Sequence, residues 1–406
     1  MQTSATKPTE TNRAGLLSLG VDIRQLAMLA ALVAVWIIFQ ALTFQQPGSF
    51  FSAQNLFNLA IQTSVVGIMV GGMVLVIVTR QIDLSVGSVL GFTAMTVALL
   101  QAPNPLGLNW PWWITVIVGL AVGALIGSFT GAFTAYLGVP SFVVTLAGLL
   151  IFRNACFVAA SGRTISLPDP VFQLIGGGSI GATATWIVAA VAIGFIIYQA
   201  VRGRARRQAN GFGVRPMWAE VLVTGVMVLF VFGFALAMNS YNYPQTDIPR
   251  GIPIPTLIAI AVLIFLNWMT RSTRFGRYIY AIGGNPEAAL LAGINVKRMT
   301  VYIFMLMGFL TALGAAVQAA RLNSATTNLG KDLELTVIAG AVIGGTVLAG
   351  GSGTIIGAAL GALLTSSLQG GMVLMGIPTE WQNIVLGIVL LLAVLFNTVV
   401  ARRSLK

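Results

Sequence analysis

The feature that most constrains this chain is a series of long apolar segments that recurs from one end to the other. Each has about the 20 residues that an α-helix needs to cross a bilayer. Of the 406 residues, 57% are hydrophobic and 8% are charged, whereas about a quarter of a soluble protein is charged. A β-barrel would need segments of about ten residues that alternate apolar and polar side chains, and these segments are continuous. The sequence therefore predicts an all-α, polytopic membrane protein.

Hydropathy places about 12 transmembrane helices, with about 10 as a lower bound. They form one transmembrane domain at 26–401, between a polar arm at 1–25 and a tail at 402–406. The first segment lacks a small-residue cleavage site, so we expect it to be retained as a span. The expected spans lie near 26–44, 59–79, 84–100, 112–136, 141–160, 184–201, 218–238, 254–270, 299–320, 334–350, 354–375 and 384–401.

Glycines recur every four residues in two of these spans. One set is Gly119, Gly123, Gly127 and Gly131, and the other runs from Gly353 through Gly357 to Gly361. Small residues at this spacing let two helices approach backbone to backbone. They predict close helix packing and say nothing about a substrate.

Basic residues concentrate in four segments that the parity of the spans places on one side of the membrane. The arm 1–25, the tract 202–216, the loop 271–298 and the tail 402–406 hold sixteen of the 22 Lys and Arg residues. Cytoplasmic loops of membrane proteins carry such an excess, so we expect both termini in the cytoplasm. The net charge of +12 would also suit a nucleic-acid partner, but topology explains it better, and we expect no nucleic acid.

Residues that catalysis or metal binding would need are missing. The chain has no His and one Cys, Cys156, so no His and Cys set can hold a metal ion, a haem or an iron-sulfur cluster. The only Gly-Lys pair, Gly330-Lys331, is followed by Asp332, where a phosphate-binding loop needs Ser or Thr. We therefore expect a chain that is not an enzyme and does not hydrolyse ATP by itself.

The loop 271–298 contains the signals of a short helix of its own. Asn285 can cap its start, Pro286 suits the first helical position, Glu287 suits the positive helix end, and Gly293 can close the helix. Ala288, Leu291 and Ala292 share one face, and the small side chains at 288, 289 and 292 would fit a groove of another protein. Docking to a motor subunit is the favoured interpretation, and a connector packed on its own bundle is the alternative.

A second polar segment, 79–88, interrupts what would otherwise be one apolar region. In one interpretation Asp83 caps the following helix and Arg80 offers it a charged partner. In the other, the same segment 79–88 is a bent helical junction near the transport path, as in the broken helices of other transporters.

Several stretches resemble the signatures of permease subunits of bacterial sugar ABC importers of the ribose/xylose class. The basic tract 202–208, with the hydrophobic pair around it, is most similar to the xylose permease branch. The resemblance covers most of the chain, and its stretches are Ile82-Asp83-Leu84-Ser85-Val86-Gly87-Ser88, Pro140-Ser141-Phe142-Val143-Val144-Thr145-Leu146-Ala147-Gly148, Tyr280-Ala281-Ile282-Gly283-Gly284-Asn285-Pro286-Glu287-Ala288-Ala289 and Ala292-Gly293-Ile294-Asn295-Val296.

The resemblance implies an ABC importer permease bundle that moves a monosaccharide, a pentose such as D-xylose, across the bacterial inner membrane by alternating access. It implies a homodimer, two ATP-binding subunits that hold ATP and Mg²⁺, a periplasmic sugar-binding protein, and no cofactor on this chain. The loop residues that would contact the ATP-binding subunit are Asn285, Pro286, Glu287, Ala288, Ala289, Leu291, Ala292, Gly293 and Ile294. The candidate residues of the transport path or its gate are Arg80, Asp83, Ser85, Thr145, Arg153 and Asn154.

An ion-coupled secondary sugar transporter is the alternative function. Such proteins use intramembrane acidic residues or His to carry protons, and this chain has ten Asp and Glu residues and no His. Asp83 and Glu334 are its candidate carriers near membrane depth, with Asp332 and Glu380 as further candidates. Uptake that needs an ATP-binding subunit, rather than an ion gradient, would distinguish the two functions.

Overall fold

The computed structural model describes residues 23–45, 48–212, 214 and 216–404, and within them the chain is almost entirely helical. The helices of the first half are α1 (Ile23–Thr43), α2 (Ala53–Val78), α3 (Val86–Gln101), α4 (Trp112–Tyr136), α5 (Ser141–Ala160), α6 (Pro170–Gly177) and α7 (Gly181–Ala209). Those of the second half are α8 (Met217–Asn239), α9 (Ile254–Ser272), α10 (Arg274–Gly284), α11 (Pro286–Leu291), α12 (Val296–Leu322), α13 (Leu333–Ile343), α14 (Ile355–Leu374) and α15 (Thr379–Ser404).

Twelve helices of the described residues correspond one to one to the twelve expected spans. Eight are long and apolar enough to cross a membrane, and four more carry shorter apolar stretches in α1, α3, α13 and α15. The prediction of an all-α polytopic membrane protein is therefore confirmed. The three other helices, α6, α10 and α11, lie between spans and were not expected as spans.

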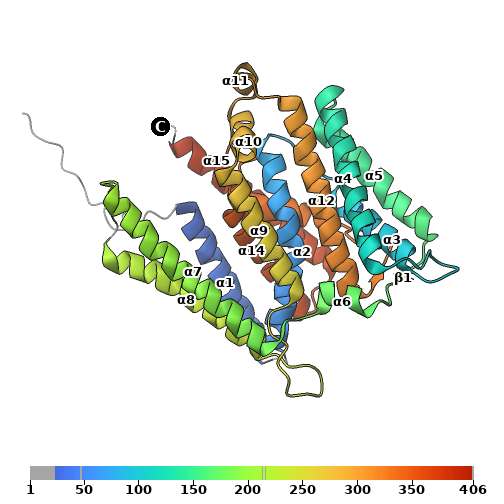
Figure 1. The fold of residues 1–406 in the computed structure, drawn as a ribbon, viewed down its shortest axis with the longest axis horizontal. Coiled ribbons are helices and arrows are strands. Elements are labelled where there is room, and N and C mark those ends of the chain that lie inside the picture. The colour runs from blue at the N-terminus through green and yellow to red at the C-terminus, as the bar shows by residue number, and fades with distance from the viewer. Residues whose placement is uncertain (1–22, 46–47, 213, 215, 405–406) are drawn as a thin grey trace, which may run out of the picture.

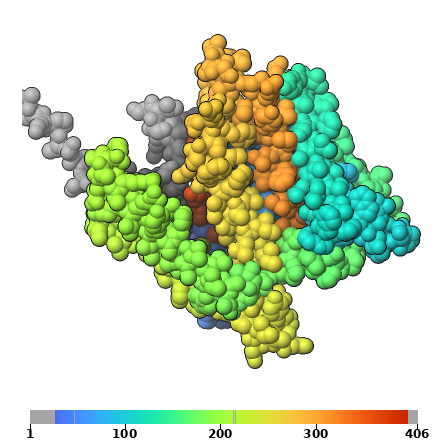
Figure 2. All heavy atoms as spheres, viewed as in Figure 1, coloured from blue at the N-terminus to red at the C-terminus, as the bar shows by residue number. Residues whose placement is uncertain are grey.

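Of the eight long spans, α2 has the most buried apolar stretch, and it runs through the middle of the bundle in Figure 1. Its most apolar stretch is 89% buried, because α12, α14, α9 and α13 pack around it. A helix that is apolar on all sides belongs in such a position. By contrast, α7 and α8 are 11% buried and form a hairpin at the edge of the molecule, seen in green in Figure 2. Lipid is the natural surrounding of this hairpin.

Both sets of glycines lie at close helix contacts. A side chain at Gly127 would meet the carbonyl oxygen of Phe304 in α12 at 2.1 Å, and one at Gly361 would meet that of Gly340 in α13 at 2.0 Å. No side chain fits at such distances, so glycine is required where α4 packs on α12 and where α14 packs on α13.

Several boundaries differ from those expected. The span expected at 334–350 ends at Ile343, because Gly345, Gly350 and Gly351 adopt positive φ in a loop that follows it. The basic tract 202–209 continues α7 as helix, and α1 begins at Ile23. The expected arm therefore falls largely outside the described residues, as does the end of the tail at 405–406.

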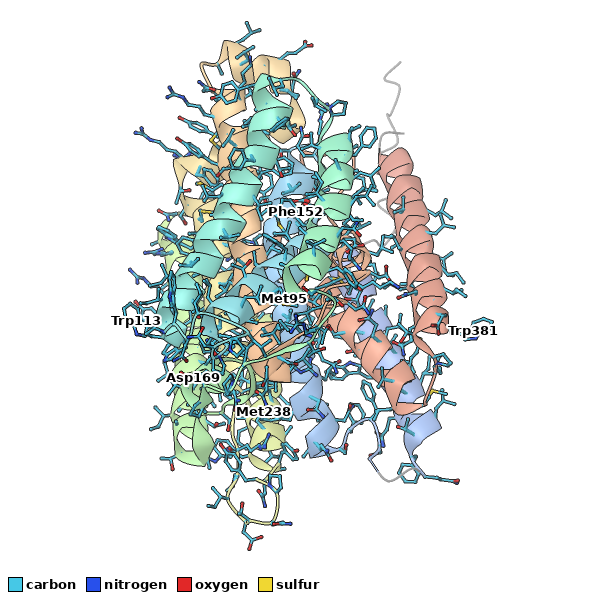
Figure 3. All side chains as sticks on the ribbon, turned by 90° about the vertical axis from the view of Figure 1, so that its right-hand side faces the viewer. Met95, Trp113, Phe152, Asp169, Met238 and Trp381 are labelled. Atoms are coloured by element: carbon cyan, nitrogen blue, oxygen red, sulfur yellow. The ribbon has the colours of Figure 1, made fainter. Side chains whose placement is uncertain are left out.

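The two ends of the bundle differ in structure. One end carries α10 and α11, at the top of Figure 1. Asp169 and Met238, labelled in Figure 3, lie in the half of the molecule towards the opposite end. Asp169 caps α6 there, and the strands β1 (Ile165–Ser166) and β2 (Ser324–Ala325) pair antiparallel. The expected cytoplasmic loop therefore lies at one end, and the chain links after α5 and α12 lie at the other.

Candidate functional site

The short helix in the loop 271–298 has the local geometry that its sequence predicts. The Asn285 side chain accepts hydrogen bonds from the backbone N–H groups of Glu287 and Ala288, both at 3.0 Å. Pro286 occupies the first turn. Gly293 has φ +82, and the Ile294 N–H donates to the carbonyl of Ala289 at 3.0 Å, which closes the helix. The predicted caps of α11 are therefore confirmed.

The side chains of α11 divide between two surroundings. Ala288 and Ala292 are exposed, and Leu291 is 90% exposed. Ala289 is 4% exposed and belongs to the hydrophobic core. The expectation that Ala289 enters a partner's groove is therefore wrong, because this side chain packs inside its own protein.

The segment from Thr79 to Ser85 breaks the helical path between α2 and α3. Arg80 has φ +63 and ends α2, and residues 81–85 are not helical. The Asp83 carboxylate accepts hydrogen bonds from the backbone N–H of Ser85 at 2.9 Å and from its hydroxyl at 2.6 Å. These bonds hold Ser85, which is the N-cap residue of α3. The Ser85 side chain itself makes no capping hydrogen bond to the first turn of the helix. The expected break is present, and Asp83 supports the turn rather than capping the helix directly.

Arg80 does not pair with Asp83. Its Nε donates to the carbonyl of Gly283 at 2.9 Å, and its Nη2 donates to that of Gly284 at 2.7 Å. Both carbonyls end α10, directly before α11. The expected partnership with Asp83 was wrong, because the left-handed backbone of Arg80 directs its side chain to a segment about 200 residues away in sequence.

The first turns of α5 hold the same junction from the other side. The Ile82 N–H donates to the Ser141 hydroxyl at 3.2 Å, and the Thr145 hydroxyl donates to the Ile82 carbonyl at 3.3 Å. A side chain at Gly148 would come within 3.2 Å of Ser85. The stretches around residues 82–85 and 141–148 thus meet in space, and Arg80, two residues before the first, binds the stretch around 283–284.

Two of the candidate path residues lie away from this junction. Arg153 and Asn154 follow Thr145 by more than two turns of α5. Asn154 is exposed and donates to the carbonyl of Leu150 at 2.8 Å. The Nε of Arg153 is buried without a hydrogen-bond partner among the described residues. The site therefore brings together Arg80, Asp83, Ser85 and Thr145 but excludes this pair.

A small pocket with polar side chains in an otherwise apolar lining adjoins the junction on the side of α4 and α12. Asp83 and Ser85 line it together with Thr130 of α4 and Thr311 of α12. Thr311 is fully buried, and its hydroxyl has no partner among the described residues. The sequence analysis missed both threonines, although a hydroxyl in an apolar helix is a signal that could have identified them. The pocket has room for about one water molecule and not for a sugar.

Comparison with known proteins identifies the class of this membrane protein. The protein-family model described as "Branched-chain amino acid transport system / permease component" matches residues 55–394. The chain belongs to this family of membrane permease components. No solved structure matches it.

The permease is also similar to curated proteins over nearly its full length. It is 39% identical to the xylose transport system permease protein XylH of Escherichia coli K12, over 98% of this chain and 97% of the relative. It is 36% identical to XylH of Haemophilus influenzae, over 93% and 97%. It is 34% identical to the ribose import permease protein RbsC of E. coli K12, over 90% and 92%.

The described part of the permease contains no group of three or more Cys, Asp or Glu side chains that could hold a metal ion. The site is instead a set of contacts between structural elements that meet at one segment of the chain. One segment of seven residues, 79–85, contacts the end of α10, the start of α5 and a polar pocket. A displacement of any one of these elements would act on the others through it.

Proposed function

We propose that this chain is the transmembrane subunit of an ATP-driven importer that carries a monosaccharide, and we propose D-xylose as the first candidate. Two copies would form the path, with two ATP-binding subunits on the cytoplasmic side and a periplasmic sugar-binding protein on the other. The permease would lie in the bacterial inner membrane with both termini in the cytoplasm. It would catalyse no reaction and bind no cofactor, since ATP and Mg²⁺ would belong to the ATP-binding subunits.

The observation that carries this proposal is the exposed apolar face of α11. Leu291 is 90% exposed on a helix that projects from one end of the bundle in Figure 1. Exposed Ala288 and Ala292 flank it at helical spacing, while Ala289 anchors the helix to the bundle. A connector that served only its own bundle would bury its large apolar residue. A helix anchored on one face and apolar on the other fits a groove of a second protein.

Full-length similarity to xylose permeases supports the choice of sugar. Closure of the ATP-binding subunits would push on α11 and switch the bundle between inward and outward access. The sugar needs only weak contacts in the path, because it must leave as readily as it enters. Selectivity for the sugar would then reside mainly in the periplasmic binding protein.

One structural observation supports the alternative, an ion-coupled secondary sugar transporter. Glu334 at the start of α13 is 6% exposed, and its Oε2 has no hydrogen-bond partner among the described residues. A buried carboxyl group is a candidate proton carrier. We favour the ATP-driven function because α11 would have no role in a transporter without a partner subunit.

The test compares Leu291→Arg with Leu291→Met in the permease co-expressed with its ATP-binding subunit and binding protein. Leu291→Arg should abolish co-purification of the ATP-binding subunit and uptake of labelled D-xylose, because it places a charge in an apolar groove. Folding should be unaffected, since the side chain is exposed. Leu291→Met, which keeps the apolar volume, should behave like the wild type. D-ribose and D-glucose, tested in parallel, define the sugar.

Two results would contradict the proposal. Full complex formation and uptake with Leu291→Arg would make α11 a connector. Accumulation of sugar by the wild-type permease alone in liposomes, driven by an imposed proton or sodium gradient, would establish the secondary transporter.

A further inference from the structure

Arg80, which follows α2 in a left-handed backbone conformation, hydrogen-bonds to the end of α10 through its side chain. Arg80 occupies the left-handed region, with φ +63, at the position after a helix where glycine is usual. It is the only Lys or Arg among the described residues with a positive φ. A long side chain is retained in such a conformation where it performs a specific task.

That task is visible in the contacts of the guanidinium group. It donates to the carbonyls of Gly283 and Gly284, which end α10 and carry the negative end of that helix. The next residue, Asn285, is the cap of α11. Arg80 therefore holds the point where α10 turns into the exposed helix.

The backbone around Arg80 is closely packed, so the Arg80 side chain and the end of α10 have little room to move relative to each other. A side chain at Gly283 would lie 2.0 Å from the carbonyl oxygen of Val78, and one at Gly350 would lie 2.3 Å from Cγ of Arg80. The N–H of Gly351 donates to the Val78 carbonyl at 2.8 Å. The Tyr280 hydroxyl donates to the Gly353 carbonyl at 2.8 Å. Three segments, the ends of α2 and α10 and the loop between α13 and α14, are thus joined at one point.

On its other side, Arg80 is continuous with the segment that reaches the inside of the bundle. Gln81 follows directly, Ile82 is held by Ser141 and Thr145 of α5, and Asp83 lines the polar pocket. Among the described residues, the Arg80 side chain hydrogen-bonds to both carbonyls that end α10. Arg80 is therefore a side-chain route by which a movement of α11 can reach this segment, beside the backbone contact of Gly283 with Val78.

We propose that Arg80 is the positioning residue that transmits the movement of α11 to the segment 81–85 and so couples ATP hydrolysis to opening of the path. The proposal rests on the proposed function, since it assumes that α11 docks on an ATP-binding subunit. It gives Arg80 a role in coupling, separate from assembly, because the guanidinium of Arg80 binds the end of α10 and is not part of the exposed apolar face of α11.

The test uses the complete complex of permease, ATP-binding subunit and sugar-binding protein in liposomes, with Arg80→Gln, Arg80→Lys and Arg298→Gln. Arg80→Gln keeps a polar side chain but removes the charged fork that reaches both carbonyls. Arg298→Gln removes an exposed cation in the first turn of α12 and serves as the control. The measurements are the yield and melting temperature of the complex, ATP hydrolysis, and uptake of labelled D-xylose.

With Arg80→Gln we expect normal assembly and continued ATP hydrolysis, while the number of ATP molecules hydrolysed per sugar rises about fivefold or more. Arg80→Lys should restore part of the coupling, because an ammonium group can still donate to these carbonyls. Arg298→Gln should leave the ratio unchanged.

Two results would overturn the inference: an unchanged ratio with Arg80→Gln, or hydrolysis and uptake that fall in proportion to the yield of complex. The second would make Arg80 a structural residue only. Failure of the proposed function is distinct, because the wild-type complex itself would then show no ATP-dependent uptake.

Discussion

The contact between α4 and α12 at Gly127 allows the effect of one added methyl group to be worked out. A Cβ at this position would lie 2.1 Å from the carbonyl oxygen of Phe304 and 2.8 Å from its carbonyl carbon. Ordinary contact begins at 3.4 Å, so along this line the helices must separate by 3.4 − 2.1 = 1.3 Å. Both atoms belong to a helix backbone and have no rotamer that would avoid the methyl group.

Gly127→Ala should therefore destabilise the permease. Overpacking of a close contact costs about 1 to 3 kcal/mol, and the separation also weakens the neighbouring contact between Gly123 and Gly308. Alanine favours the helix over glycine by about 1 kcal/mol, which offsets part of this cost. Gly225→Ala in α8 is the matched control, since a Cβ there has no neighbour within 4 Å. The helix-propensity gain is common to both variants, so their difference isolates the packing cost of about 1 to 3 kcal/mol.

The assay is unfolding of the purified permease in one detergent, followed by helix content during heating and during titration with a denaturing detergent. The expected order of stability is Gly127→Ala lowest, then the wild type, then Gly225→Ala equal to or above it. Equal stability of the two variants, or the reverse order, would refute the packing of α4 on α12 through these glycines.

Three further predictions concern the junction, the pocket and α11. Asp83→Asn should keep the stability and D-xylose uptake of the wild type, because an amide oxygen still accepts both bonds from Ser85. Asp83→Ala leaves a buried N–H unpaired and should cost about 1 to 3 kcal/mol of unfolding free energy. Normal stability with lost uptake in Asp83→Asn would mean that the charge is needed. Thr311→Val should be neutral or stabilising, because the buried hydroxyl has no partner among the described residues. Its control, Thr93→Val, removes a bond to the Val89 carbonyl at 2.7 Å and should cost about 1 kcal/mol of unfolding free energy. Equal losses of stability in thermal unfolding would show that the Thr311 hydroxyl is bonded. Gly293→Ala should strain the left-handed turn after α11 by about 1 to 2 kcal/mol and weaken co-purification of the ATP-binding subunit. Its control, Gly203→Ala, places a Cβ where no atom lies within 4 Å and should leave co-purification unchanged. Equal co-purification by both variants would contradict a role for that turn.

The spans and the caps of α11 could be predicted from sequence because their causes are local. Continuous apolar segments of membrane-spanning length form helices in lipid wherever they occur in a chain. In the same way, Asn285 and the turn at Gly293 act through bonds between residues two to five positions apart, and Pro286 acts through its fixed φ in the first turn. The glycine repeats could be predicted as packing faces, but the partner helix of each face could not.

The contacts that make up the candidate site depend on the tertiary structure. Asp83 is three residues from Arg80 and looked like its partner, yet a left-handed residue at the end of α2 turns the guanidinium towards α10. Ala289 and Ala288 are neighbours of the same type, and packing of α11 buries one and exposes the other.

The sequence by itself determined that this protein is a helical membrane permease and where its helices lie, because hydropathy and capping act over short distances along the chain. Only the tertiary structure decided which segments meet at Arg80 and which face of α11 is free. Those contacts join residues up to about 200 positions apart, and whether such residues meet depends on how all the helices pack together.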